Sequence, residues 1–242
     1  ILVAGPGGAG SSGTLGLRLS ASAAGADRKA RLEDTTGKPR AVTLYYAERF
    51  DAPDPVWWND IRESAPAASG ERANLVRINV GATGSMSLYP FGCVTGRGKG
   101  RMVGLAPFQG PRVARIGFHA AAKLLYVAFD LALTGENLAN SDGAGRGRAA
   151  VEVVGADIDP AGGFRAAARK YQELCPEAFE RRATAEGIWI PFTDPASVRG
   201  VEDFGIAYHE GDNSIASDDR LGISSFRYTE PMTWWMQMGK DV

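Results

Sequence analysis

The chain has 242 residues, of which 44% are hydrophobic, so it can bury a core of ordinary size in one large or two small domains. Its 27 basic and 28 acidic residues leave a formal charge of -1 at pH 7, which excludes a global field that steers it towards nucleic acid or an anionic membrane. No apolar stretch approaches the roughly 20 residues that span a bilayer. We therefore expect a soluble globular protein with neutral partners, and neither a nucleic-acid nor a membrane partner.

The glycine-rich opening, residues 5–13, allows two interpretations. Gly5, Gly7 and Gly10 fit the G-x-G-x-x-G pattern that holds a dinucleotide pyrophosphate at a helix N-terminus. However, two further glycines stand where that helix should start, and no βαβ succession follows. We interpret the segment as a flexible loop and expect no cofactor.

Alternating apolar and polar residues predict β-strands over the first two thirds of the chain. Two sets of apolar residues alternate in this way: Leu15, Leu17 and Leu19, and Val76, Ile78 and Val80. Further strands are expected over residues 41–50, 101–105, 112–118, 124–133 and 149–158, separated by turns such as residues 96–100 and 141–145. Many strands joined by turns, with no helical pattern between them, are typical of a β-sandwich.

From Phe164 onwards the apolar period becomes helical. Four residues fall on one face of this amphipathic helix: Phe164, Ala168, Tyr171 and Cys175. Pro176 interrupts it, and we expect a second short helix over residues 177–183. The boundary between two domains is placed here.

The two cysteines, Cys93 and Cys175, lie in segments that are expected to belong to different structural units. We predict two buried thiols rather than a disulfide, because isolated bridges are rare outside small secreted scaffolds. Neither cysteine has metal-ligand spacing, and His119 and His209 are the only histidines. We therefore expect no metal site.

Two apolar runs that follow the helix each end in a carboxylate. The first leads to Asp194 and the second, residues 222–231, to Glu230. Barrel enzymes place their working groups at the C-terminal ends of strands, and glycoside hydrolysis requires a pair of carboxylates. Asp194 and Glu230 are the candidate catalytic residues, with a helix N-cap before Pro195 and a turn before Pro231 as the structural alternatives.

Aromatic and titratable residues supply candidates for substrate binding. An exposed ring suits a sugar, whose C–H face stacks on it while nearby polar groups bind the hydroxyls. The candidate rings are Trp57, Trp58, Trp189, Trp234 and Trp235, and core packing is the alternative for each. His209 and Glu210 form either part of an acid/base site or a locally hydrogen-bonded loop.

Several stretches resemble a known group of proteins: residues 45–50, 57–63, 163–168 and 187–235. They resemble large glycoside-hydrolase-like proteins in which an N-terminal, galactose mutarotase-like β-sandwich leads through a helical linker into a TIM barrel. The resemblance implies a mainly β chain, with a supersandwich-like β-sandwich at residues 1–160, a helical linker at 161–185 and the first strands of an incomplete α/β barrel at 186–242.

The same resemblance implies a function. Such proteins act on α-linked oligo- or polysaccharides outside the cytoplasm, so we expect a fragment of a carbohydrate-active enzyme that has a carbohydrate partner. The alternative is a non-catalytic carbohydrate-binding or structural β-sandwich module.

Overall fold

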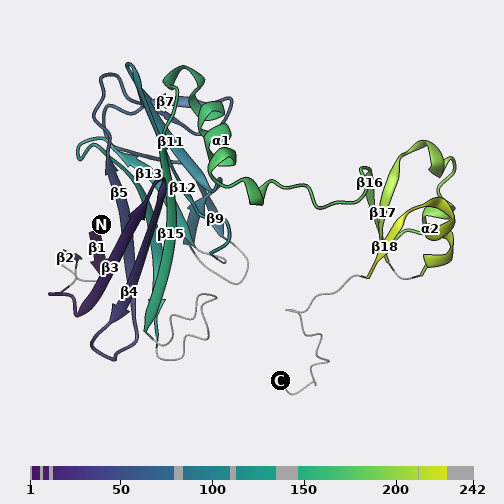
Figure 1. Cartoon of the computed structure of the whole chain (residues 1–242), viewed down its shortest axis with the longest axis horizontal. Coiled ribbons are helices and arrows are strands. Elements are labelled where there is room, and N and C mark those ends of the chain that lie inside the picture. Colours follow the sequence, from purple (N-terminus) through teal and green to yellow (C-terminus); the bar gives the residue numbers. More distant parts are fainter. Residues whose placement is uncertain are drawn as a thin grey trace, which may run out of the picture. The chain divides into compact units, whose positions relative to one another are not determined.

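The computed structural model describes residues 2–5, 8–10, 13–78, 84–109, 113–134, 147–211 and 213–227, and side chains from residue 13 onwards. The fold is mainly β and contains several sheets (Figure 1). The chain divides into two compact units, Ile1–Glu180 and Arg181–Val242. None of the helices in the described ranges is long and apolar enough to cross a membrane.

The first unit contains an antiparallel sheet whose described strands follow the order β2-β1-β5-β14-β13-β8. The strands are β1 (Leu2–Gly5), β2 (Gly8–Gly10), β5 (Arg40–Arg49), β8 (Glu71–Ala73), β13 (Ala114–His119) and β14 (Leu124–Leu133). β5 and β14 pair along their full length of ten residues each. The range predicted for β14 is confirmed residue for residue.

A second antiparallel sheet of this unit follows the order β3-β4-β15-β12-β11-β6-β7. Its strands are β3 (Leu17–Ala24), β4 (Asp27–Asp34), β6 (Val56–Trp58), β7 (Ser64–Pro66), β11 (Phe91–Gly96), β12 (Lys99–Leu105) and β15 (Arg148–Asp157). β9 (Leu75–Ile78) and β10 (Gly84–Ser87) form a separate antiparallel pair. The turn predicted at residues 96–100 connects β11 to β12.

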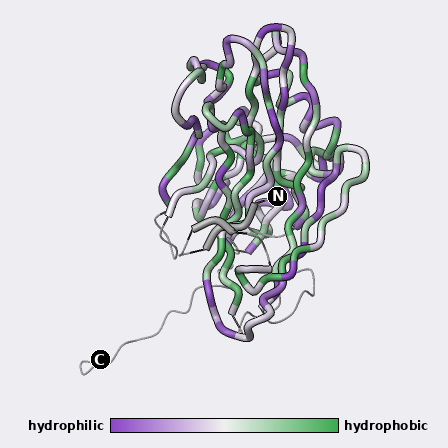
Figure 2. Tube along the Cα trace, turned by 90° about the vertical axis from the view of Figure 1, so that its left-hand side faces the viewer, coloured by the Kyte–Doolittle hydropathy of each residue, from purple (hydrophilic) through white to green (hydrophobic). Residues whose placement is uncertain are grey.

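The two large sheets share one hydrophobic core. Because side chains alternate across a strand, each sheet turns one apolar face inwards, and hydrophobic and hydrophilic residues alternate along the trace (Figure 2). Leu44 and Phe129 of the first sheet belong to the same buried cluster as Val103 and Val151 of the second. Trp57 of β6 is 2% exposed and is the largest side chain in this core.

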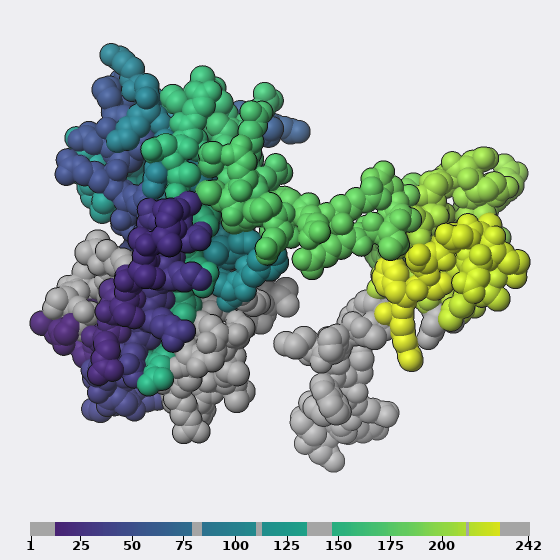
Figure 3. All heavy atoms as spheres, viewed as in Figure 1, coloured from purple at the N-terminus to yellow at the C-terminus, as the bar shows by residue number. Residues whose placement is uncertain are grey.

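One helix covers the outer face of the second sheet. It is α1 (Gly163–Leu174), which follows the 3-10 turn η1 (Pro160–Gly162) and lies at the surface of the first unit (Figures 1 and 3). Ala167 and Tyr171 pack with Cys93, Met102 and Val154 in a second cluster. Tyr171 Oη donates to the carbonyl of Leu105 at 2.7 Å. The predicted amphipathic helix and the two buried free thiols are confirmed.

The second unit contains a short parallel sheet in the order β16-β17-β18. The strands are β16 (Ile188–Pro191), β17 (Ile206–Glu210) and β18 (Ser224–Phe226). Parallel strands need a crossover, which α2 (Ile215–Leu221) provides between β17 and β18, and the 3-10 turns η3 (Pro195–Ser197) and η4 (Val201–Asp203) lie between β16 and β17. Gly222 ends α2 in the left-handed conformation at φ 69°.

Two local predictions are wrong. β2 is a strand that pairs with β1, whereas the sequence predicts a loop over residues 5–13. Ladder hydrogen bonds come from the backbone, so small residues without a strand pattern can still pair. The second helix expected over residues 177–183 is only the 3-10 turn η2 (Pro176–Ala178), because Pro176 has no N–H with which to continue α1.

A substitution of Gly92 in β11 tests how closely the two sheets pack. A Cβ at this position would lie 2.7 Å from Trp57 Cη2 and 2.8 Å from Ile116 Cγ2, both in the core. We predict that Gly92→Ala lowers the free energy of unfolding of the first unit by about 1–3 kcal/mol through overpacking. Urea denaturation followed by circular dichroism measures this change.

Gly13→Ala is the matched control, since a Cβ at Gly13 meets no atom within 4 Å. We expect it to change the free energy of unfolding by less than about 0.5 kcal/mol. Equal destabilisation by the two variants would contradict the close approach of the sheets at Gly92.

Candidate functional site

Polar side chains collect at the C-terminal ends of the parallel strands in the second unit. The chain places Asp194 three residues after β16, and His209 and Glu210 at the end of β17. In parallel sheets the carboxyl ends of the strands meet at one edge, which is where ligands bind in α/β folds. The register aligns Ile190, His209 and Ser225 across the three strands, so these residues share one face of the sheet.

A buried histidine–carboxylate pair joins this face to α2. The side chains of His209 and Asp218 are both 0% exposed, and His209 Nδ1 lies 2.6 Å from Asp218 Oδ2. Ser225 Oγ donates to the same carboxylate oxygen at 2.6 Å. A carboxylate oxygen accepts hydrogen bonds, so in the tautomer that donates from Nδ1 to Asp218 the other ring nitrogen, Nε2, is an acceptor. Asp218 therefore fixes the orientation of the imidazole.

Two atoms of this pair are unsatisfied. Within the described ranges, His209 Nε2 and Asp218 Oδ1 are buried and have no hydrogen-bond partner. Leaving such a group unpaired costs about 1–3 kcal/mol. Native proteins retain few groups of this kind, and a catalytic role or a bound water is among the reasons.

Gly211 leaves space beside the free imidazole nitrogen. A Cβ at Gly211 would lie 2.8 Å from His209 Nε2 and 3.0 Å from Asn213 Oδ1. The Gly211 N–H donates to the carbonyl of Phe226 at 3.0 Å, which ties the start of the β17–α2 loop to β18. The imidazole thus turns Nε2 towards the loop at the carboxyl edge of the sheet.

Asp194 has the geometry of an N-cap. Its carboxylate accepts from the Ala196 N–H at 3.0 Å, and Pro195 is the first residue of η3. Ser217 Oγ of α2 also donates to it, at 3.3 Å. The Ala196 N–H lowers the pKa of Asp194 below its ordinary value, against a smaller effect of burial, and Ser214, Ser217 and His209 lower it further. Asp194 is therefore a carboxylate at neutral pH, next to the His209 pair.

Trp189 and Glu210 lie on the opposite face of the sheet from His209. Trp189 aligns with Tyr208 across β16 and β17 and is 50% exposed. Tyr208 Oη donates to the carbonyl of Ala185 at 2.7 Å, and Glu210 aligns with Pro191. The structure thus brings Asp194, in the loop after β16, close to His209, whereas Trp189 and Glu210 lie on the face of the sheet opposite to His209.

The two tryptophans of the first unit have structural contacts. Trp57 lies in the core, so no face of its ring is open to a sugar. Trp58 is partly buried, and its Nε1 donates to Thr95 Oγ1 at 2.9 Å. A Cβ on Gly163 would lie 2.4 Å from the Trp58 ring, so this ring packs against the start of α1. The remaining candidates, Glu230, Trp234 and Trp235, lie outside the described residues.

Asp218 was not identified from the sequence, and neither were Ser214 and Ser217, which bond to Asp194. A signal was present, because Ser214, Ser217 and Asp218 recur at the spacing of one helical face. That face is buried although it is polar, the reverse of the usual amphipathic pattern. A polar stripe on a short helix that follows a strand could therefore have located the partner of His209.

The chemistry available at this edge is that of proton transfer and charge stabilisation. An imidazole oriented by a carboxylate is a common acid/base arrangement, and Asp194 supplies a negative charge nearby. Among the described residues, no group of three or more His, Cys, Asp and Glu is arranged to hold a metal ion. No model of a known protein family matches the chain, and no curated protein matches it significantly.

Asp218→Ala tests the buried pair. It leaves His209 Nδ1 without its acceptor, so we predict that the free energy of opening of the second unit falls by about 1–3 kcal/mol. Amide hydrogen exchange over β17 and β18 should accelerate about fivefold to 150-fold. Asp219→Ala removes an exposed carboxylate at the next position of α2 and should leave the exchange rates unchanged. Similar exchange in both variants would contradict a structural role for the His209–Asp218 contact.

Proposed function

We propose that the chain is a fragment of a carbohydrate-active enzyme, a glycoside hydrolase that uses paired carboxylates. In this proposal the first unit is a mutarotase-like β-sandwich, and the second unit is the opening of a TIM-type barrel. Two antiparallel sheets with a shared core support the first assignment. Parallel strands joined by 3-10 turns and a helix support the second.

The observation that carries the proposal is the environment of Asp194. It is a carboxylate with a lowered pKa, placed just after the carboxyl end of a parallel strand and close to a buried histidine–carboxylate pair. In glycoside hydrolysis one carboxyl group stays ionised as the nucleophile or base, while its partner has a raised pKa and acts as the acid. Asp194 suits the ionised role, and in this proposal Glu230, the other candidate catalytic residue from the sequence, takes the role of the acid.

The other residues take supporting roles in this proposal. Trp189 offers an exposed ring on which a sugar can stack, and Glu210 a carboxylate for its hydroxyls. Both lie on the face of the sheet opposite to His209, the face that lines the interior when such a sheet closes into a barrel. Asp218 and Ser225 position His209 and do not touch the substrate.

The alternative function, a non-catalytic carbohydrate-binding or structural module, places binding in the first unit. This alternative requires Trp57 and Trp58 to present exposed rings to a sugar. Trp57 is buried and Trp58 packs against Gly163, so neither ring is freely exposed. The enzyme proposal is therefore preferred.

Asp194→Asn tests the catalytic role. Asparagine keeps an oxygen that caps η3 and removes the charge, so we predict normal folding with a kcat on α-linked nitrophenyl glycosides reduced about 100-fold or more. Asp203→Asn, an exposed carboxylate on η4, is the control and should retain the full rate. Colorimetric release of nitrophenol measures both.

The pH profile provides a second readout of the same residue. Because the pKa of Asp194 is lowered, its carboxylate loses its charge only when the pH falls below the ordinary value, and its contribution to the rate should persist until then. Unchanged kcat in Asp194→Asn would contradict the proposed role. No hydrolysis of any glycoside by the unaltered chain, with glycan binding retained, would favour the non-catalytic module.

A further inference from the structure

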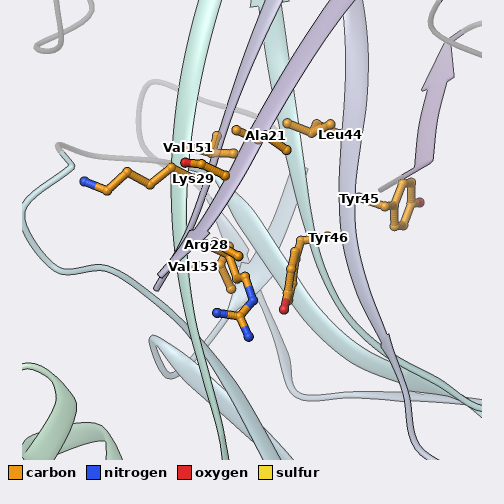
Figure 4. Close-up of a pocket in the computed structure, with 11 residues that line it drawn as sticks. Ala21, Arg28, Lys29, Leu44, Tyr45, Tyr46, Val151 and Val153 are labelled. Atoms are coloured by element: carbon orange, nitrogen blue, oxygen red, sulfur yellow. The ribbon is translucent and has the colours of Figure 1, made fainter. Parts of the chain in front are cut away.

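A pocket opens between the two large sheets of the first unit. Its volume is about 260 Å³, and β3, β4 and β15 of one sheet and β5 of the other line it (Figure 4). Its apolar wall consists of Ala21, Ala23, Ala30, Leu44, Val151 and Val153. β3 is the edge strand of its sheet, so the pocket can be entered from the side.

Small side chains on adjacent strands create this hollow. The register places Ala21, Ala30 and Val151 side by side on β3, β4 and β15, on the face that is turned towards the other sheet. Alanine reaches only one carbon from the backbone, so the two sheets do not fill the space between them at this edge. The pocket is therefore a property of the sequence of β3 and β4.

The guanidinium group of Arg28 lies at one end of the pocket. Arg28 aligns with Ala23 and Val153, so its side chain lies on the inward face of the sheet, and its guanidinium lies beside Tyr46 (Figure 4). The hydrogen bonds of Arg28 go to the backbone carbonyls of Gly25, at 2.6 Å, and Asp27, at 2.9 Å. Among the described residues no ion pair involves Arg28.

The nearby carboxylate is occupied by other partners. Glu48 accepts from Arg101 Nε at 2.5 Å and from Tyr46 Oη. Burial opposes ionisation of Glu48, but the hydrogen bonds from Arg101 and Tyr46 outweigh it and hold its pKa below the ordinary value. The partly buried Glu48 carboxylate is thus paired with Arg101 and not with Arg28 at this end of the pocket.

The other charged group on the lining is already paired. Lys29 Nζ lies 2.9 Å from Glu152 Oε1 on the outer face of the sheet, and its side chain extends away from the pocket (Figure 4). The pocket therefore combines apolar walls with a single cation that lacks a carboxylate partner within the described residues.

We propose that this pocket binds a small molecule with an apolar body and a carboxylate at one end. The carboxylate would accept hydrogen bonds from the Arg28 guanidinium, and the apolar body would lie against the alanine and valine wall. A cavity of about 150 Å³ holds benzene, and drug-sized sites begin near 300 Å³, so the pocket suits a chain of about eight carbons or a fused bicyclic ring. A sugar does not fit, because the wall offers its hydroxyls few partners. This site is independent of the proposed hydrolase function and lies in the other unit.

Octanoate and 1-octanol, titrated calorimetrically into the full chain, test the carboxylate end. Octanoate should bind more tightly than octanol, which has the same length and no charge. Arg28→Met keeps an aliphatic stem and removes the charge, so it should weaken octanoate binding about tenfold or more and leave octanol unaffected. Arg31→Met is the control, because Arg31 is an exposed arginine on the opposite face of β4.

Ala21→Leu tests the location. It adds three carbons to the pocket wall from an exposed position on the edge strand, and it should abolish octanoate binding without loss of fold. Ser20→Leu places the same side chain on the opposite face of β3 and should bind octanoate as the unaltered chain does. Failure of the unaltered chain to bind octanoate, equal affinity for octanoate and octanol, or unchanged binding in Arg28→Met or Ala21→Leu would each overturn the proposal.

Discussion

The pairing of β5 with β14 sets the register on which the first unit depends. These strands run antiparallel over ten residues each, from Arg40 opposite Leu133 to Arg49 opposite Leu124. A shift of one residue would turn every side chain of β5 to the other face. Leu44 would then leave the core and Tyr46 would leave the space between the sheets. The same ladder therefore stabilises the core and presents a tyrosine and a glutamate to the arginines of the other sheet.

Polar groups are buried in different ways in the two units. In the first unit Glu48 is stabilised by a guanidinium and a phenol, and the excess cation faces an apolar pocket. In the second unit His209 and Asp218 are fully buried and leave one nitrogen and one oxygen unsatisfied among the described residues. A buried charge requires partners, and an incomplete set of partners identifies a place where a ligand or substrate can contribute. The two candidate sites follow from this single rule.

The parallel sheet divides the residues of the second unit into two groups. His209, Ser225 and Asp218 hold the sheet against α2, and Asp194 joins them through Ser217. Trp189 and Glu210 lie on the opposite face, where the side chains are more exposed. Adjacent residues of a strand face opposite sides, so the neighbours His209 and Glu210 have different surroundings and different roles.

The sequence alone determined the local elements, because their signals are periodic and short in range. The apolar run over residues 124–133 located β14, the helical spacing from Phe164 located α1, and the position of Asp194 before Pro195 indicated its N-cap. The strand β2 escaped prediction because its glycine and alanine residues carry no alternation, although its backbone pairs with β1, which in turn pairs with β5. Only the tertiary structure showed that Trp57 is buried in the core, that Asp218 contacts His209, and that Arg28 lies beside Tyr46. These contacts depend on which strands and helices become neighbours, and that choice is made by the burial of whole faces rather than by any residue's own sequence surroundings.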